Sequence, residues 1–485
     1  MKMPQAGSEI DGFVIGARVH SGSMALIYQV AYAGGRASSF DMVMKVPRMT
    51  EGDGAETIVG FEVEHQIMQL LSGPHVPRLV AAGDMATLPY LVMEYVPGRT
   101  LNHWLEKSAQ GMRPEAAELA RLGAAVAHAT HSLHQQDTVH LDIKPANVII
   151  RDDGSAVLLD FGLSVHAHSP DLLAEELRQA VGSPAYMAPE QVVGVRGDPR
   201  SDIFAIGVML FELATGELPF GSPTTRAGLR QRLWMDPPPL RQLRPELPEW
   251  LQEVVMRCLA CAADQRYPSA AHLAFDLTHC DQIQVTARGR ALTGPGFVTH
   301  FKRWIRAAGL HYRPIPLPTR QIEQVPIIMV AVPNQDVSDA TLYSLRQAVA
   351  RSLGIRPGAR LACVTVIAPG ATSATDPESS ETSVHRQLLS MLQQWTRGLP
   401  LDEHQTSFHV LESGDVAQAL LRYAQGNHVS MIVMGAATHE LPLQRLVAPV
   451  PIKVAMEAPC TVVLVKQSLP FEQLAEADTN APSVD

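Results

Sequence analysis

One short segment limits what this chain can fold into more than any other part of its sequence. Residues 139–149 read VHLDIKPANVI, in which Asp142 is followed two positions later by a lysine and five positions later by an asparagine. Such an aspartate can orient a hydroxyl and accept its proton, the lysine can balance charge on a phosphoryl group, and the asparagine oxygen can hold a metal ion. Asp160-Phe161-Gly162 follows the apolar residues VLL and adds a carboxylate at the end of a strand. This spacing indicates a phosphoryl-transfer site.

Length and composition define the kind of molecule that carries these residues. At 485 residues the chain is too long for one ordinary hydrophobic core, so we expect two domains. Its 46% hydrophobic and 18% charged residues indicate a globular protein. The net charge of -10 argues against a nucleic-acid partner, which would require a basic face. Five cysteines do not make a disulfide framework in a chain of this length, which favours a reducing, cytoplasmic location.

The apolar runs predict no transmembrane segment. The first residues, MKMPQAGSEIDGF, lack the apolar stretch of a signal peptide, and the longest apolar runs have the length of buried strands. Residues 297–313 predict an amphipathic helix with basic residues beside its apolar face. We favour docking of this helix on the protein itself, with an interfacial membrane helix as the alternative.

The pattern of apolar, polar and turn-forming residues divides the chain into segments. Residues 10–95 are rich in strand patterns and residues 96–283 are mainly helical, which predicts an α+β domain of two lobes. Residues 284–324 contain the turn-forming runs ALTGPG and RPIPLPTR and are assigned to a linker. Over 325–467 apolar strands alternate with amphipathic helices, which predicts an α/β doubly wound parallel sheet of the Rossmann type. The acidic remainder, 468–485, is expected to be disordered.

The motifs of the first domain resemble, in order and spacing, those of the protein kinase family in its bacterial serine/threonine branch. The remaining family motifs are MVMKV, Ala188-Pro189-Glu190 and Ser201-Asp202-Ile203. The resemblance implies a bilobal protein kinase domain over residues 10–283 that transfers the γ-phosphate of ATP, with Mg²⁺, to serine or threonine hydroxyls of a protein substrate. Lys144 and the small residue Ser183 in GSPAYMAPE resemble serine/threonine kinases rather than tyrosine kinases.

The resemblance gives each matching residue a role. Asp142 is the catalytic base, Lys144 stabilises the γ-phosphate, and Lys45 binds the α- and β-phosphates. Glu64, on a helix predicted over 61–71, is the ion-pair partner of Lys45, with Glu62 as the alternative. The metal ligands are Asn147 and Asp160. The nucleotide is expected to contact Gly22, Ile27, Lys45, Met93, Glu94, Val96, Ile149 and Leu159, with Met93 as gatekeeper of the hinge LVMEYVPG. Two structural roles complete the set: a Glu190–Arg266 ion pair, and Asp202 as the brace of the catalytic loop.

Three positions depart from the family pattern. The glycine-rich loop keeps only Gly22, with His20 and Ala25 at the other glycine positions, which predicts a stiffer loop. Leu141 precedes the catalytic aspartate where many kinases have an arginine that pairs with an activation-loop phosphate. The loop over 163–186 also has few hydroxyl groups, so we expect activity without activation-loop phosphorylation. The alternative function is a nucleotide-binding pseudokinase scaffold, which the intact charged positions disfavour.

The second domain resembles the universal stress protein family, on the order of its elements, on SMIVMGA and on the ending APCTVVLV. Nucleotide-binding members have an aspartate after the first strand, where this chain has Pro333, and a glycine-rich phosphate loop, of which only Gly435 is kept. Ala448-Pro449 replaces a glycine and a hydroxyl residue of that loop and removes a backbone donor. We therefore expect weak or no nucleotide binding here, and a regulatory module or a homodimer through this domain.

A group of cysteines and histidines has the outline of a metal site. Cys258 and Cys261 form a C-x-x-C pair, with His272, His279 and Cys280 following. The run RCLACAADQRYPSA also fits a helix whose cysteines pack in the core of the helical lobe, and this is the interpretation that we prefer.

Overall fold

The computed structural model describes residues 4–22, 25–48, 55–83, 88–166, 183–223, 225–294, 327–334, 339–354, 359–368, 377–401, 404–427, 429–436 and 450–466. The chain forms two compact units, residues 1–322 and 323–485. The helix expected over 297–313 lies outside the described residues. No helix in the described ranges combines the length and the apolar character that crossing a bilayer requires.

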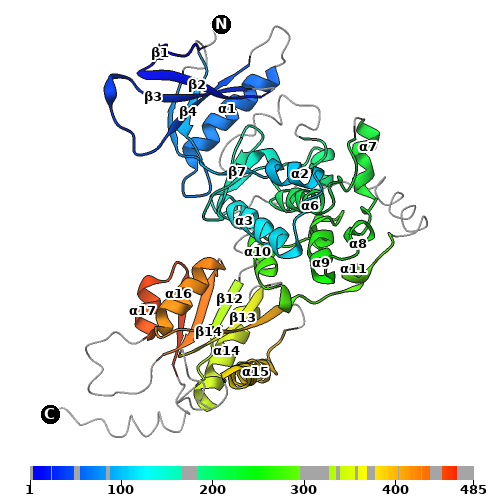
Figure 1. Ribbon diagram of the computed structural model, residues 1–485. Helices are drawn as coiled ribbons and strands as arrows, with labels where there is room; N and C mark the ends of the chain where they lie inside the picture. Colours follow the sequence, from blue (N-terminus) through cyan, green and yellow to red (C-terminus); the bar gives the residue numbers. More distant parts are fainter. Residues whose placement is uncertain are drawn as a thin grey trace, which may run out of the picture. The chain divides into compact units, whose positions relative to one another are not determined.

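The first unit begins with an antiparallel sheet of six strands in the order β1-β2-β3-β4-β6-β5. The strands are β1 (Glu9–Ile10), β2 (Phe13–Ser21), β3 (Ala25–Tyr32), β4 (Met42–Pro47), β5 (Leu79–Ala82) and β6 (Leu91–Glu94). Helix α1 (Ala55–Leu70) lies beside this sheet (Figure 1). Phe61, Ile67 and Met68 face the core, as the periodicity predicts, while Glu62 is exposed.

The rest of the first unit is mainly helical. Its principal helices are α2 (Asn102–Ala109), α3 (Ala116–His134), α6 (Arg200–Thr215), α9 (Glu249–Cys258) and α10 (Ala270–Thr278). The shorter ones are α5 (Pro189–Val192), α7 (Arg226–Arg230), α8 (Leu240–Leu243) and α11 (Ala287–Arg290). Short strands complete it: β7 (Arg99–Thr100), β8 (Thr138–Val139), β9 (Val148–Ile150), β10 (Ala156–Leu158) and β11 (Val165–His166). The expected α+β arrangement, a strand-rich part followed by a mainly helical part, is therefore confirmed.

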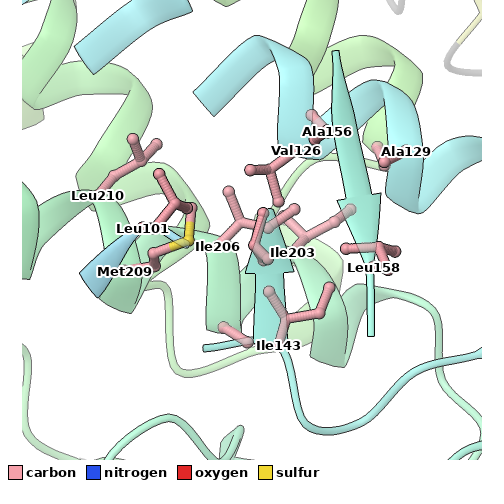
Figure 2. Packing of buried hydrophobic residues seen from close by; sticks show 14 of the residues in the cluster. Leu101, Val126, Ala129, Ile143, Ala156, Leu158, Ile203, Ile206, Met209 and Leu210 are labelled. Atoms are coloured by element: carbon pink, nitrogen blue, oxygen red, sulfur yellow. The ribbon is translucent and has the colours of Figure 1, made fainter. Parts of the chain in front are cut away.

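Helix α6 is the centre of this helical lobe. Its sequence, RSDIFAIGVMLFELAT, is apolar on most sides, and a helix of that kind is stable only when it is surrounded by other elements. Figure 2 shows its side chains meeting those of α3, of β10, of the residue that precedes α2 and of the loop that carries Asp142. The labelled residues are Leu101, Val126, Ala129, Ile143, Ala156, Leu158, Ile203, Ile206, Met209 and Leu210. The helix ends at Gly216, whose φ of 76° suits glycine. The loop of the site thus rests directly on the core.

The second unit contains a five-stranded sheet in the order β14-β13-β12-β15-β16, with all neighbours parallel. The strands are β12 (Ile327–Ala331), β13 (Arg360–Ile367), β14 (Gln405–Glu412), β15 (Met431–Gly435) and β16 (Thr461–Val465). Helices α14 (Asp339–Gly354) and α15 (Pro377–Thr396) cover one face, and α16 (Val416–Gly426) and α17 (Val450–Glu457) the other (Figure 1). The predicted doubly wound parallel sheet is confirmed. The chain moves across the sheet in one direction from β12 to β14 and in the other direction from β15 to β16. Because each crossover is right-handed, the helices of the two halves lie on opposite faces.

Candidate active site

The first part of the site joins the sheet to helix α1. Lys45 projects from β4, and its Nζ donates to Glu64 Oε1 at 2.7 Å and to Glu64 Oε2 at 2.6 Å. The same nitrogen donates to Asp160 Oδ1 at 3.0 Å. The predicted partner is therefore Glu64, on the buried side of α1, and not the exposed Glu62. One cation thus links a strand, a helix and the aspartate of the Asp-Phe-Gly segment.

Burial and pairing compete at these charges. Burial opposes the charged form of Lys45, but Glu64 and Asp160 outweigh it and raise the pKa of Lys45. Burial raises the pKa of Glu64 to about 6, although Lys45 favours the carboxylate. Lys45 lowers the pKa of Asp160, whose side chain is 41% exposed. Lys45 and Asp160 are therefore charged at neutral pH, while Glu64 titrates close to it.

The second part of the site is the loop after β8. Lys144 Nζ donates to Asp142 Oδ2 at 2.7 Å, and Asn147 Nδ2 donates to Asp142 Oδ2 and to the Asp142 carbonyl, both at 3.0 Å. Asp142 is 7% exposed and Asn147 is 6% exposed, so these groups are held rather than hydrated. The loop therefore brings the three residues that the sequence singled out into direct contact.

A buried carboxylate fixes the backbone of this loop. Asp202, at the start of α6, accepts from the backbone N–H of His140 at 2.9 Å and of Leu141 at 2.8 Å. His134 Nε2 lies 2.9 Å from Asp202 Oδ2. Leu141 has a φ of 64° and Asp160 a φ of 66°, a region that such residues rarely occupy. The predicted brace is present, and it holds the strained conformation beside Asp142.

The residues present suit a magnesium ion. Asn147 turns its amide nitrogen toward Asp142, and its other polar atom is an oxygen. With the Asp160 carboxylate it offers the hard oxygen ligands that Mg²⁺ prefers. No cluster of three or more histidine, cysteine or acidic side chains that could hold a metal occurs among the described residues. A small ligand set of this kind fits Mg²⁺, which usually completes its shell with water and substrate phosphates.

Three of the residues expected at the nucleotide, Ile27, Met93 and Glu94, lie on the strands next to β4, which carries Lys45. Ile27 pairs with Lys45 across β3 and β4, and Met93 lies on β6 beside β4. The N–H of Glu94 donates to the Arg78 carbonyl, and its side chain pairs with Arg151 at 3.1 Å. Val96 follows β6, while Ile149 and Leu159 are half-buried near Asn147. Gly22 ends the first half of the glycine-rich loop, whose residues 23 and 24 lie outside the described ranges.

A further segment, residues 183–190, runs from the loop of Asp142 to α5. Ser183 accepts from Lys144 Nζ at 2.7 Å, and its backbone N–H donates to Asp142 Oδ1 at 3.1 Å. Glu190 accepts from Arg266 at 2.7 and 2.9 Å, as predicted, and from Ser201 Oγ at 2.6 Å. The first end of this segment therefore contacts Asp142 and Lys144, while the other end is anchored in the core.

Two contacts in this region were not predicted from the sequence. Gln191 Nε2 donates to the Leu141 carbonyl at 3.0 Å and so connects α5 to the loop of Asp142. The Tyr186 hydroxyl donates to Glu212 on α6. Both contacts join residues far apart in the chain, so that only the position of Gln191 next to the Ala188-Pro189-Glu190 motif could have suggested one of them.

The remaining candidates from the sequence are the cysteine pair of the first unit and the loop positions of the second unit. Cys258 is fully buried on α9, and burial raises the pKa of its thiol to about 12, so it remains protonated. Cys261 lies 3.6 Å from the Met235 carbonyl. In the second unit Pro333 follows β12 and Gly435 ends β15, while residues 437–449, which contain Ala448-Pro449, lie outside the described ranges.

Comparison with known families agrees with this architecture. The protein kinase domain family matches residues 18–276, which is more than half of the chain. The chain therefore belongs to the protein kinase family. The universal stress protein family matches residues 326–466, so the second unit is a domain of that family.

Curated relatives of the first unit include bacterial serine/threonine-protein kinases. A probable serine/threonine-protein kinase PknB of Lactococcus lactis is 29% identical over 269 residues, which is 55% of this chain and 42% of that protein. Serine/threonine-protein kinase PrkC of Bacillus subtilis is 29% identical over 238 residues, 49% of this chain and 36% of the relative. PknB of Mycolicibacterium smegmatis is 31% identical over 258 residues, 52% and 41% of the two chains. The chain thus spans less than half the length of these relatives.

Proposed function

We propose that this protein is a serine/threonine protein kinase that transfers the γ-phosphate of ATP to a serine or threonine hydroxyl of a protein. The observation that carries the proposal is the link from Lys45 to both Glu64 and Asp160, because it joins the phosphate-binding strand to a metal ligand. The names of the bacterial relatives support the same activity.

Each residue of the site then has a defined task. Lys45, held by Glu64, binds the α- and β-phosphates. Asn147 and Asp160 would hold Mg²⁺, which neutralises charge on the phosphates when bound. Asp142 orients the acceptor hydroxyl and takes its proton, and Lys144, 2.7 Å from both Asp142 and Ser183, places positive charge beside the transferred group. The hinge, through Met93, Glu94 and Val96, is the proposed contact of the adenine.

Activation-loop phosphorylation is not part of this proposal. Leu141, 4% exposed, packs with Val139 and Val165 in a small apolar cluster where many kinases hold an arginine for a phosphate. An apolar contact between β8 and β11 therefore supports the catalytic loop in place of a phosphate-dependent ion pair. We expect the transfer rate to be unchanged after treatment of the purified protein with a phosphatase.

The second candidate function is a pseudokinase scaffold that binds nucleotide without transfer. The observation that favours it is the glycine-rich loop, in which His20 and Ala25 flank the remaining Gly22. A side chain at position 20 restricts the approach of this loop to phosphate.

The test is transfer of radiolabelled γ-phosphate from ATP to casein by the full-length protein, with phosphoamino-acid analysis. Label on serine or threonine that falls by about 100-fold or more in Asp142→Asn supports the kinase, since general bases contribute roughly that much. Nucleotide binding without label in the wild-type protein supports the scaffold. Equal labelling by the wild-type and Asp142→Asn proteins would contradict the role of Asp142.

For the second unit we propose an assembly role, in the form of a homodimer. Strand β16 is at the edge of the sheet and exposes Leu464 at 41%. The neighbouring helix α17 exposes Ile452 at 46% and Met456 at 81%. A strand that has one neighbour among the described strands, with exposed apolar side chains beside it, favours pairing with another chain. We also propose a cytoplasmic location, which suits a chain of this length with only five cysteines.

A further inference from the structure

Arg232 is a buried cation that forms no ion pair with any residue in the described ranges. It lies on a short 3-10 helix (Gln231–Leu233), and its side chain is 0% exposed. Its Nη1 donates to the backbone carbonyl of Met187. Within the described ranges its Nε and Nη2 have no hydrogen-bond partner. Burial lowers the pKa of Arg232 to about 10, so the guanidinium stays charged at neutral pH.

This arrangement costs stability. A buried charge is costly unless it is paired, and an apolar side chain of similar size at such a position is often neutral or stabilising. The packing of the lobe therefore does not require an arginine at position 232. The one polar contact that the guanidinium makes among the described residues points instead to Met187.

Arg232 belongs to a stack of four side chains, which we call the aromatic stack: Arg232, Phe220, Phe204 and Arg266. The Arg232 guanidinium lies 5.4 Å from the centre of the Phe220 ring, and the rings of Phe220 and Phe204 are stacked at 5.8 Å. Arg266 lies 4.9 Å from the Phe204 ring and binds Glu190 with both of its terminal nitrogens. The two arginines of the stack thus hold Met187 and Glu190, two points on the same segment.

That segment lies where a protein substrate must pass. Its first described residue, Ser183, contacts both Asp142 and Lys144, the groups to which an acceptor hydroxyl is presented in the proposed function. The residues next to the acceptor therefore lie beside the segment from Ser183 to Met187. The hydrogen bond from Arg232 holds the Met187 carbonyl in one direction. It therefore restricts the backbone between Ser183 and the start of α5.

We propose that Arg232 is a positioning residue for the protein substrate, acting through the Met187 carbonyl at a cost to the stability of the fold. The role of Arg232 rests on the proposed kinase function. It differs from the role of Arg266, whose charge is paired with Glu190 and therefore serves the fold itself. The two arginines at opposite ends of the aromatic stack are thus predicted to respond oppositely to the same substitution.

The test compares Arg232→Met with Arg266→Met in the full-length protein. Arg232→Met should keep or raise the midpoint of thermal unfolding, since methionine packs well against Phe220, while the KM for casein rises about tenfold and the KM for ATP stays constant. A loss of that size matches one hydrogen bond from a charged group. Arg232→Lys, which keeps a donor, should give an intermediate KM. Arg266→Met should lower the midpoint, because Glu190 is left buried without its partner.

Hydrogen exchange of residues 183–190 gives a second measurement that needs no phosphate transfer. Faster exchange in Arg232→Met than in the wild-type protein supports the proposal. A lower unfolding midpoint with both KM values changed would show that Arg232 is only structural and would overturn it. An unchanged KM for casein, or unchanged exchange over 183–190, would also overturn it. If the wild-type protein transfers no phosphate, the kinase function fails, and the exchange measurement still decides the role of Arg232.

Discussion

Glu64 is the residue of the site whose charge is most finely balanced. Its carboxylate is held by Lys45 at 2.6 Å, yet its side chain is only 4% exposed, and burial disfavours the ion. The pKa of about 6 lies above the ordinary value of 4.5, so Glu64 takes up a proton at a pH where an exposed glutamate stays ionised. A protonated Glu64 no longer holds Lys45 by charge.

This balance predicts that the proposed activity falls at acid pH, which gives its pH profile an acid limb. The kcat/KM for ATP should fall as the pH drops through about 6 and level off above it, because this parameter reports the ionisation of the free enzyme. Glu64→Gln should abolish the limb and lower kcat/KM at pH 8 by about tenfold or more, since a charged hydrogen bond is replaced by a neutral one. Steady-state kinetics from pH 5 to 8 measure both effects, with the pH range chosen roughly around the pKa.

The matched control is Glu62→Gln, two residues earlier on the exposed side of α1. It should keep the limb and the rate of the wild-type protein. A limb near pH 6 that persists in Glu64→Gln would assign the titration to another group.

At the residue scale, contacts could be predicted from the sequence where the spacing of the family motifs indicates which residues pair. The contacts of Lys45 with Glu64 and of Glu190 with Arg266 were predicted in this way and are present. The contact of Arg232 with Met187 was not, because it joins residues 45 positions apart whose types carry no pairing signal. A lone arginine in a sequence is usually exposed, and only the packing around it makes it a buried cation.

Helix α11 is held in place by two buried polar side chains of helix α9. Glu253 on α9 accepts from the Thr286 backbone at 3.0 Å, from the Thr286 hydroxyl at 2.8 Å and from the Gly289 backbone at 2.8 Å. Gln252 Nε2 donates to the carbonyls of Arg288, Gly289 and Ala291. Packing of the first unit thus continues to Ala291, within the range that the turn-forming residues had assigned to the linker.

Gly289 is the point of closest approach between α11 and α9. A Cβ added there would lie 2.8 Å from the Glu249 carbonyl oxygen and 2.7 Å from a methyl group of Val285. Gly289→Ala should therefore lower the free energy of unfolding by about 1–3 kcal/mol, the usual cost of overpacking. Urea unfolding of the full-length protein, followed by intrinsic fluorescence, measures the change in the first unit.

Gly294 provides the control for this substitution. It lies five residues further along, and a Cβ there would meet no atom of the described residues within 4 Å. Gly294→Ala should leave the unfolding curve unchanged. Equal stability of the two variants would mean that α11 is not packed on α9 in solution.

At the element scale, long periodic segments were predictable and short paired strands were not. The buried face of α1 follows from its apolar spacing, although the helix begins at Ala55, earlier than the predicted start at Phe61. Strands β8 and β11 have two residues each and pair with one another across 25 positions of chain. Too short to show a periodicity, they exist because the fold brings their backbones together.

The whole molecule combines a kinase domain with a second unit in whose sheet β16, among the described strands, has a neighbour on one side only. Alternating strands and helices were enough to predict that sheet, because each crossover must bury an apolar helix face. They could not predict which surfaces remain uncovered. Of the two edge strands, β14 has alternating buried side chains, whereas β16 leaves Leu464 exposed beside α17.

If β16 forms the proposed homodimer, a charge on its exposed side should separate the two copies. Leu464→Lys places an ammonium where apolar contact is expected and should convert a dimer into a monomer, as measured by light scattering of the full-length protein during size-exclusion chromatography. Tyr343→Lys is the control, because Tyr343 is 59% exposed on α14 of the same unit, away from β16 in sequence. A monomeric wild-type protein, or a dimer that survives Leu464→Lys, would exclude this edge as the interface.

Loss of the dimer in Leu464→Lys alone, with casein phosphorylation kept, would show that assembly and phosphate transfer are carried by separate units of the chain.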